Sequence, residues 1–164
     1  EHCLKSNCKV VFILYGTICN ISAIIDRVKE GGKIAIVHAD LINGLSSKEI
    51  AADYFKMKTR ADGIISAKIP VLKRAMSLGI IAGQRTFIID SLALESMEKS
   101  MEAFKPDFLE ILPGVMPQIT KRIKTDLHVP LIASGLVRNR DDIMEAFLAG
   151  ADAVSTTKEE LWYI

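Results

Sequence analysis

The chain has 164 residues, of which 49% are hydrophobic and 25% are charged. This length and apolar content suit one domain with a sizeable core, and they exclude disorder, which requires low hydrophobicity and high net charge. No apolar run approaches the ~18 residues of a membrane-spanning helix. Lys and Arg total 21 against 20 for Asp and Glu, so the net charge is +1. Any nucleic-acid role must therefore depend on a local basic patch. We expect a single domain over residues 1–164.

Three cysteines, Cys3, Cys8 and Cys19, lie within the first 19 residues. An odd number crowded at one end forms no disulfide framework, and no histidine stands at a zinc-site spacing from them. We therefore expect free thiols and no metal site. Free thiols are typical of a reducing compartment, and the sequence shows no export signal. These features predict a cytoplasmic protein.

Seven short apolar runs alternate with amphipathic stretches along the chain. Their nearly continuous apolar composition is typical of parallel strands that are covered on both faces. The predicted strands are Val10–Gly16, Lys33–Asp40, Gly63–Lys68, Gly79–Gly83, Phe108–Leu112, Pro130–Gly135 and Ala153–Thr156.

Helix signals lie between these runs. Ser46 and Glu49 have the spacing of a capping box, and Asn139 can cap a later helix. Two sets of residues at helical spacing predict the buried helix faces: Ile50, Tyr54 and Met57, and Ile119, Ile123 and Leu127.

Strict alternation of strands and helices leaves two architectures open, an open doubly wound sheet and a (β/α)8 barrel. The sequence contains neither GxGxxG nor GxxxxGK[ST], the signatures of dinucleotide and P-loop sites. Asp62 and Asp152 each stand just before a predicted strand that ends in polar residues, and this internal repetition favours the barrel. We expect an α/β, TIM-like (β/α)8 barrel. Since only seven strands are predicted, its first strand is expected to be missing from this chain.

Polar residues follow the last two predicted strands. In phosphate-binding barrels the anion is held by the loops after strands seven and eight and by a helix N-terminus. Gly135 would let backbone N–H groups approach a phosphate, and Ser155 and Thr156 would add hydroxyl donors. Ser134 belongs to the same predicted phosphate site, although a second glycine there would give more room. The alternative is a turn at Gly135 and hydroxyls that only cap.

Five further residues near strand ends are candidate ligand contacts. His38 and Asp40 lie two apart, as a general-base pair or a structural pair would. Lys68 could form a Schiff base, bind a phosphate or pair with an acidic neighbour. Glu110 interrupts an apolar strand, and because an unpaired buried carboxylate is costly, it needs a cation or a ligand hydroxyl. Arg85, predicted just after the fourth strand, is its natural partner, or else a surface charge.

Basic residues also cluster outside the predicted strands. Solvated outer helix faces are the default explanation, and a nucleic-acid surface is the alternative. Aromatic residues make up only 6% of the chain, too little for an extensive base-stacking platform. The candidates are Lys121, Arg122, Lys124, Arg138 and Arg140.

An ordered series of motifs extends over essentially the whole chain. This series resembles the glycerol uptake operon antiterminator family of bacterial regulators. It comprises 38–45 (HADLINGL), 62–66 (DGIIS), Gln84-Arg85, Asp90-Ser91, 106–114 (PDFLEILPG), Ser134-Gly135-Leu136, 153–157 (AVSTT) and Leu161-Trp162.

The resemblance implies a TIM-barrel-like regulator that senses glycerol 3-phosphate and binds leader messenger RNA, so that transcription passes a terminator. It implies no catalytic residues, no cofactor and no membrane association. The RNA would contact Lys121–Lys124, Arg138–Arg140 or a surface formed by a homodimer. The competing interpretation is a phosphosugar isomerase or aldolase that uses the same phosphate site, with Lys68 or the His38–Asp40 pair as the catalyst.

Overall fold

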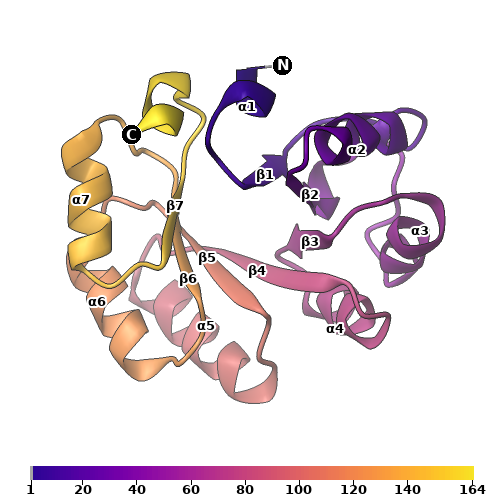
Figure 1. Ribbon diagram of the computed structural model, residues 1–164. Helices are drawn as coiled ribbons and strands as arrows, with labels where there is room; N and C mark the ends of the chain where they lie inside the picture. Colours follow the sequence, from indigo (N-terminus) through magenta and orange to yellow (C-terminus); the bar gives the residue numbers. More distant parts are fainter. Residues whose placement is uncertain (1) are drawn as a thin grey trace. The chain divides into compact units, whose positions relative to one another are not determined.

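The computed structural model describes residues 2–164, which form an alternating series of parallel strands and helices (Figure 1). All seven predicted strands are present. They are β1 (Val10–Ile13), β2 (Ile34–His38), β3 (Gly63–Ser66), β4 (Ile81–Phe87), β5 (Phe108–Leu112), β6 (Leu131–Ser134) and β7 (Ala153–Ser155).

Helices connect these strands. The α-helices are α1 (His2–Lys5), α2 (Ile21–Glu30), α3 (Ile50–Lys58), α4 (Ile69–Ser77), α5 (Ser91–Ala103), α6 (Pro117–Asp126) and α7 (Arg140–Leu148). Two short 3-10 helices, η1 (Ala39–Leu41) and η2 (Glu159–Tyr163), complete the series.

The chain forms two compact units, divided within β4 between Gln84 and Arg85. Consecutive strands pair in parallel in the first unit, as β1–β2, β2–β3 and β3–β4, and in the second unit, as β5–β6 and β6–β7. A doubly wound sheet reverses its strand order at a switch point, whereas neighbouring barrel strands follow chain order. The α/β class is thus confirmed. Barrel closure by a further strand before β1, and a single domain, stay predictions.

The parallel strands of the first unit pack closely against one another. Val37 of β2 lies opposite Ile64 of β3, and both side chains are fully buried. At Gly63 a Cβ atom would lie 2.6 Å from Ile36 Cδ1 and 2.8 Å from the Ile81 carbonyl oxygen. The beginning of β3 therefore has room only for glycine.

The second unit has its own apolar core beneath α5 and α6. Leu109, Ile111 and Leu131 of the strands pack with Ile123 of α6, and all four are at most 1% exposed. Met116, Ile119 and Leu127 pack against this cluster. The predicted apolar face of α6 is therefore confirmed.

Two local predictions were wrong. The strand predicted at Gly79–Gly83 is β4, and it continues to Phe87, so Arg85 lies within the strand instead of in the loop after it. The capping box predicted at Ser46–Glu49 is also absent. The Ser46 hydroxyl instead accepts a hydrogen bond from the Lys48 N–H at 3.2 Å, and α3 begins at Ile50.

The buried face of α3 also differs from the predicted one. Ile50 is 61% exposed and Met57 is 74% exposed. The Tyr54 side chain lies near the surface, where its hydroxyl donates to the Ile18 carbonyl oxygen at 2.8 Å. The buried residues of α3 are Ala51, Ala52 and Phe55.

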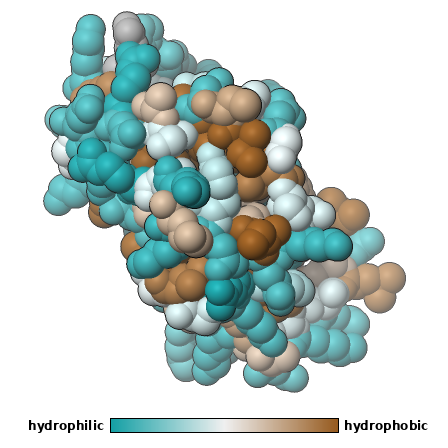
Figure 2. Space-filling model, turned by 90° about the vertical axis from the view of Figure 1, so that its right-hand side faces the viewer, coloured by the Kyte–Doolittle hydropathy of each residue, from teal (hydrophilic) through white to brown (hydrophobic). Residues whose placement is uncertain are grey.

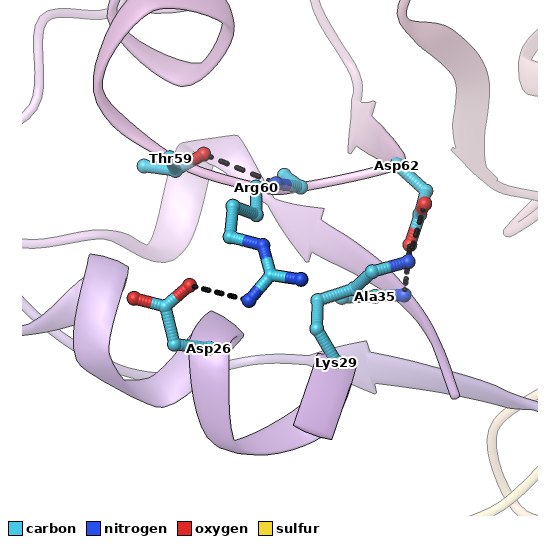
Figure 3. Close-up of polar contacts among 7 residues, drawn as sticks. Asp26, Lys29, Ala35, Thr59, Arg60 and Asp62 are labelled. Carbon is cyan, nitrogen blue, oxygen red and sulfur yellow. Dashed lines mark hydrogen bonds and ion pairs between the residues drawn. The ribbon is translucent and has the colours of Figure 1, made fainter. Parts of the chain in front are cut away.

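A carboxylate joins β2 to β3 at their N-terminal ends. The Asp62 Oδ2 atom accepts a hydrogen bond from the Ala35 N–H at 2.8 Å, and the Asp62 N–H donates to the Ala35 carbonyl at 3.0 Å. Figure 3 shows Lys29 of α2 reaching the same carboxylate, with its Nζ atom 2.7 Å from both oxygens. One side chain thus ties a helix and two strands together. We call this arrangement the Asp62 clasp.

The second unit repeats this arrangement at its own strand beginnings. The Asp152 Oδ2 atom accepts from the Leu131 N–H at 2.8 Å, and the Asp152 N–H donates to the Leu131 carbonyl at 2.8 Å. Lys124 of α6 pairs with the same carboxylate at 2.6 Å. We call this the Asp152 clasp. The similarity between Asp62 and Asp152 noted in the sequence is therefore a repeated structural device.

The surface is mixed in polarity. On the face shown in Figure 2, hydrophobic residues lie among hydrophilic ones. Within residues 2–164, no helix is both long enough and apolar enough to cross a bilayer.

Candidate functional site

The first unit gathers three polar residues at the carboxyl ends of β2 and β3. The Ser66 hydroxyl donates to both oxygens of Asp40, at 3.0 and 2.8 Å, and the Ala67 N–H donates to Asp40 Oδ2 at 2.9 Å. The Lys68 Nζ atom lies 3.5 Å from Asp40 Oδ1, and the Lys68 N–H donates to the Ser66 hydroxyl. The sequence left three roles open for Lys68, and the structure shows one of them, pairing with an acidic neighbour.

The strand predicted at Lys33–Asp40 ends at His38, so His38 and Asp40 do not lie on one strand face. His38 is the last residue of β2 and is 6% exposed, whereas Asp40 lies in η1. The strand alternation that would have aligned the two side chains ends at His38. Ser66 entered the sequence analysis only as part of the motif at 62–66, yet its hydroxyl hydrogen-bonds to both oxygens of Asp40.

The second unit buries a charged pair between β4 and β5. Glu110 is 2% exposed at the centre of β5, and its Oε2 atom lies 3.5 Å from Arg85 Nη1. The Ser134 side chain at the end of β6 hydrogen-bonds to the same carboxyl. The predicted partnership of Arg85 with Glu110 is therefore confirmed, and the alternative of a surface Arg85 is wrong.

Opposing influences act on the pKa of the Glu110 carboxyl. Burial raises the pKa of the Glu110 carboxyl above its ordinary value, while Arg85 and the Ser134 hydrogen bond act in the opposite direction. The Arg85 guanidinium carbon also lies 5.4 Å from the centre of the Phe87 ring, within cation–π range. Phe87 lies two residues along β4 from Arg85, and sequence reasoning missed its role because β4 was predicted to end earlier.

The predicted phosphate residues lie together at the ends of β6 and β7. Ser134 pairs in register with Ser155. Gly135 has a φ of +77°, and Leu136 has a φ of +60°, which is uncommon for any residue other than glycine. The Thr156 hydroxyl is already engaged, because it donates to the Val137 carbonyl at 3.3 Å. Gly135 and Ser155 are thus better placed than Ser134 and Thr156 to contact an anion.

Gly114 is a site residue that the sequence reasoning quoted but gave no role. Its N–H donates to the Gly135 carbonyl at 3.0 Å. A Cβ atom at Gly114 would lie 2.7 Å from the Ser134 backbone nitrogen. The loop after β5 is thereby fixed against the end of β6, and the adjacent Pro113-Gly114 pair was the available turn signal.

The five basic candidates fall into two groups. Arg122 binds Glu98 at 2.9 Å, and Lys124 belongs to the Asp152 clasp, so both have structural partners. Within residues 2–164, no ion pair is found for the other three, which are exposed: Lys121, Arg138 and Arg140.

Comparison with known proteins supports the family resemblance that the sequence motifs indicate. A family model described as "Glycerol-3-phosphate responsive antiterminator" matches residues 1–162. The uncharacterized protein YgcP of Escherichia coli (strain K12) is 41% identical over 159 residues, which cover 97% of this chain and 83% of YgcP. The resemblance inferred from the sequence is therefore confirmed.

Solved structures give the same result. The glycerol uptake operon antiterminator regulatory protein of Listeria monocytogenes has a TM-score of 0.93 and 31% identity, over 97% of this chain and 86% of its own. An antiterminator-related protein of Thermotoga maritima has a TM-score of 0.85 and 34% identity, over 94% and 87%. Orotidine 5'-phosphate decarboxylase of Pyrococcus horikoshii, at 18% identity and a TM-score of 0.69 over 93% and 79%, shares the TIM-barrel type of fold.

Proposed function

This chain belongs to the glycerol-3-phosphate responsive antiterminator family, and we propose that it binds glycerol 3-phosphate and leader messenger RNA so that transcription passes a terminator. The observation that carries this proposal is the family match over residues 1–162. The protein is a regulator without catalytic residues or a cofactor. It acts in the cytoplasm, and a homodimer that joins two RNA-binding surfaces is part of the proposal.

The phosphate group binds at the ends of β6 and β7. The positive φ of Gly135 and the position of Ser155 beside Ser134 support this placement, because an anion needs closely approaching backbone N–H groups and free hydroxyl donors. Ser134 and Thr156 belong to the same site but contribute less to anion binding, because their hydroxyls already have protein partners. Arg85 and Glu110, in the same unit, are the candidates for the remaining polar groups of the ligand, and His38, Asp40 and Lys68 of the first unit stay candidate ligand contacts.

The RNA-binding surface lies on the second unit. Lys121, Arg138 and Arg140 are its best candidates because they are exposed. Arg122 and Lys124 contribute less, since each would have to leave a carboxylate before it could neutralise a phosphate. Glycerol 3-phosphate would act by binding the RNA-competent conformation more tightly than its alternative, and couplings of this kind are typically ~1–3 kcal/mol.

The catalytic alternative has less support. An aldolase-type lysine must lose its charge at neutral pH, which requires a desolvated position or a cationic neighbour. Lys68 is instead 44% exposed and its Nζ atom lies 3.5 Å from a carboxylate oxygen, so its position is neither desolvated nor beside a cation.

The ligand is tested by titration calorimetry of the purified protein with glycerol 3-phosphate, with glycerol and inorganic phosphate as controls. We expect saturable binding of glycerol 3-phosphate and no comparable binding of glycerol or inorganic phosphate alone. No heat at millimolar glycerol 3-phosphate, from protein shown to be folded, would overturn the effector assignment.

The RNA partner is tested by mobility shift with RNA transcribed from the leader of a glycerol operon of the same organism. The double variant Arg138→Ala/Arg140→Ala should weaken binding and reduce the slope of log K against log salt by about 1 for each lost phosphate contact. The matched control is Lys56→Ala/Lys58→Ala, which removes the same charge from exposed positions on α3. Equal loss in both double variants would reject the proposed surface.

A further inference from the structure

The charged pair of Arg85 and Glu110 is incompletely satisfied. Glu110 Oε2 and Arg85 Nε are both buried, and neither has a hydrogen-bond partner within residues 2–164. The nearest approach between the two groups, 3.5 Å from Nη1 to Oε2, is an ion-pair distance without hydrogen-bond geometry. Buried polar atoms in proteins are nearly always hydrogen-bonded, so these two atoms require an explanation.

The protein itself holds this pair in position. Glu110 is flanked along β5 by Leu109 and Ile111, which are both fully buried. The Ser134 side chain hydrogen-bonds to the Glu110 carboxyl, and the Phe87 ring lies 5.4 Å from the Arg85 guanidinium carbon. The site reaches the surface through Arg85, whose side chain is 15% exposed, and through Phe87, which is 57% exposed.

The chemistry of the two unpaired atoms selects the group that could satisfy them. An ionised carboxylate oxygen only accepts hydrogen bonds, and a guanidinium nitrogen only donates them. A hydroxyl does both, so it can donate to Glu110 and accept from Arg85 at the same time. A phosphate oxygen or a ketone oxygen can satisfy Arg85 but offers no proton to Glu110, and the phosphate would also be repelled by its charge.

We propose that Arg85, Glu110 and Ser134 form a subsite that recognises the secondary hydroxyl at C2 of the effector and so distinguishes glycerol 3-phosphate from dihydroxyacetone phosphate, which has a ketone at that carbon. This inference rests on the proposed function, because it assigns specificity to the same effector site. The phosphate binds at Gly135 and Ser155, and Arg85 and Glu110 determine which phosphate ester is accepted. A site built to bind a hydroxyl discriminates strongly against the analogue that lacks it, because the buried partners are then left unpaired.

The test is titration calorimetry of the full chain with glycerol 3-phosphate, dihydroxyacetone phosphate and inorganic phosphate. The wild-type protein should bind glycerol 3-phosphate at least about 10-fold more tightly than dihydroxyacetone phosphate. Glu110→Gln should reduce this ratio by about 10-fold or more, with little change for inorganic phosphate. Ser134→Ala should reduce it less, because the carboxylate remains but loses the hydrogen bond that orients it.

Two controls accompany these titrations. Glu98→Gln removes a carboxylate from α5 of the same unit, where it pairs with Arg122, and should leave the ratio unchanged. Thermal unfolding of each variant establishes that it is folded, and Ser134→Ala serves if Glu110→Gln does not fold. Tight binding of glycerol 3-phosphate with an unaltered ratio in both site variants would overturn the subsite and leave the proposed function intact. Absence of any glycerol 3-phosphate binding to the wild type would overturn the proposed function itself.

Discussion

Replacing Asp62 by alanine removes the side chain of the Asp62 clasp and should destabilise the protein by about 2–3 kcal/mol. The largest contribution is the N–H of Ala35, a fully buried residue, which loses a charged acceptor at 2.8 Å. Hydrogen bonds to charged groups contribute about 1.5–3 kcal/mol. The ion pair with Lys29 adds only about 0.5 kcal/mol, because both side chains, at 22% and 29% exposed, keep contact with solvent that screens their charges.

Urea unfolding followed by circular dichroism measures this loss in the free energy of unfolding. A second variant separates the contribution of the charge from that of the hydrogen bond. Asp62→Asn keeps an oxygen for the Ala35 N–H but loses the charge, so we expect a smaller cost of about 1 kcal/mol. Glu160→Ala is the control, since it breaks an exposed ion pair with Lys158 and should cost less than about 0.5 kcal/mol. An Asp62→Ala variant as stable as Glu160→Ala would refute the assignment of the clasp as a stabilising element.

Three further predictions concern pH and packing. The pKa of Asp152 is held low, chiefly by its hydrogen bond with Lys124, so its stabilisation exists above the ordinary carboxyl pKa and is lost as pH falls through the folded value. The Tm difference between wild type and Asp152→Asn should therefore shrink below about pH 4. The pKa of Glu110 is raised, so stability should fall as pH rises through it, and Glu110→Gln should flatten that part of the Tm profile. Gly114→Ala places a Cβ atom 2.7 Å from backbone and should lower the free energy of unfolding by about 1–3 kcal/mol, read from urea midpoints.

The strands were predictable because burial on both faces leaves a signal in consecutive residues. Phe108–Leu112 is buried at every position, and its range was predicted without error. The continuation of β4 to Phe87 was not predictable in this way, because Gln84, Arg85 and Thr86 are polar residues within a strand. Their polarity has a local cause at Arg85, whose charge is paired with Glu110.

Helix faces were less predictable, because more than one set of residues had helical spacing. In α3 the buried set of Ala51, Ala52 and Phe55 is displaced by one position from the larger set that contains Ile50 and Met57. Small alanines can face the core where a helix approaches its neighbours closely, and residue size alone does not reveal this. In α6 the choice was simpler, because charged residues surround a single apolar stripe.

The candidate site was predictable as a list of residues and much less as a set of contacts. Glu110 attracted attention because a carboxylate in an apolar strand requires a partner, and Arg85 is that partner. The sequence could not show that the Ser134 and Thr156 side chains are engaged with protein groups, since both bonds depend on loop geometry after the strands. Spacing identified which end of the strands to examine, and only the structure separated donors already in use from those available to a ligand.

The polar groups at the beginnings of the strands are better satisfied than the charged pair farther along them. At the N-terminal ends, the carboxylates of the Asp62 and Asp152 clasps each accept hydrogen bonds from a backbone N–H and a lysine. Farther along the strands, at the centre of β5 and within β4, Glu110 and Arg85 keep buried polar atoms without hydrogen-bond partners among residues 2–164. Such atoms reduce stability unless a ligand completes them, so a fold can tolerate them only where other contacts hold the strands together. The Asp152 clasp provides such contacts in the second unit, which also holds the incomplete pair.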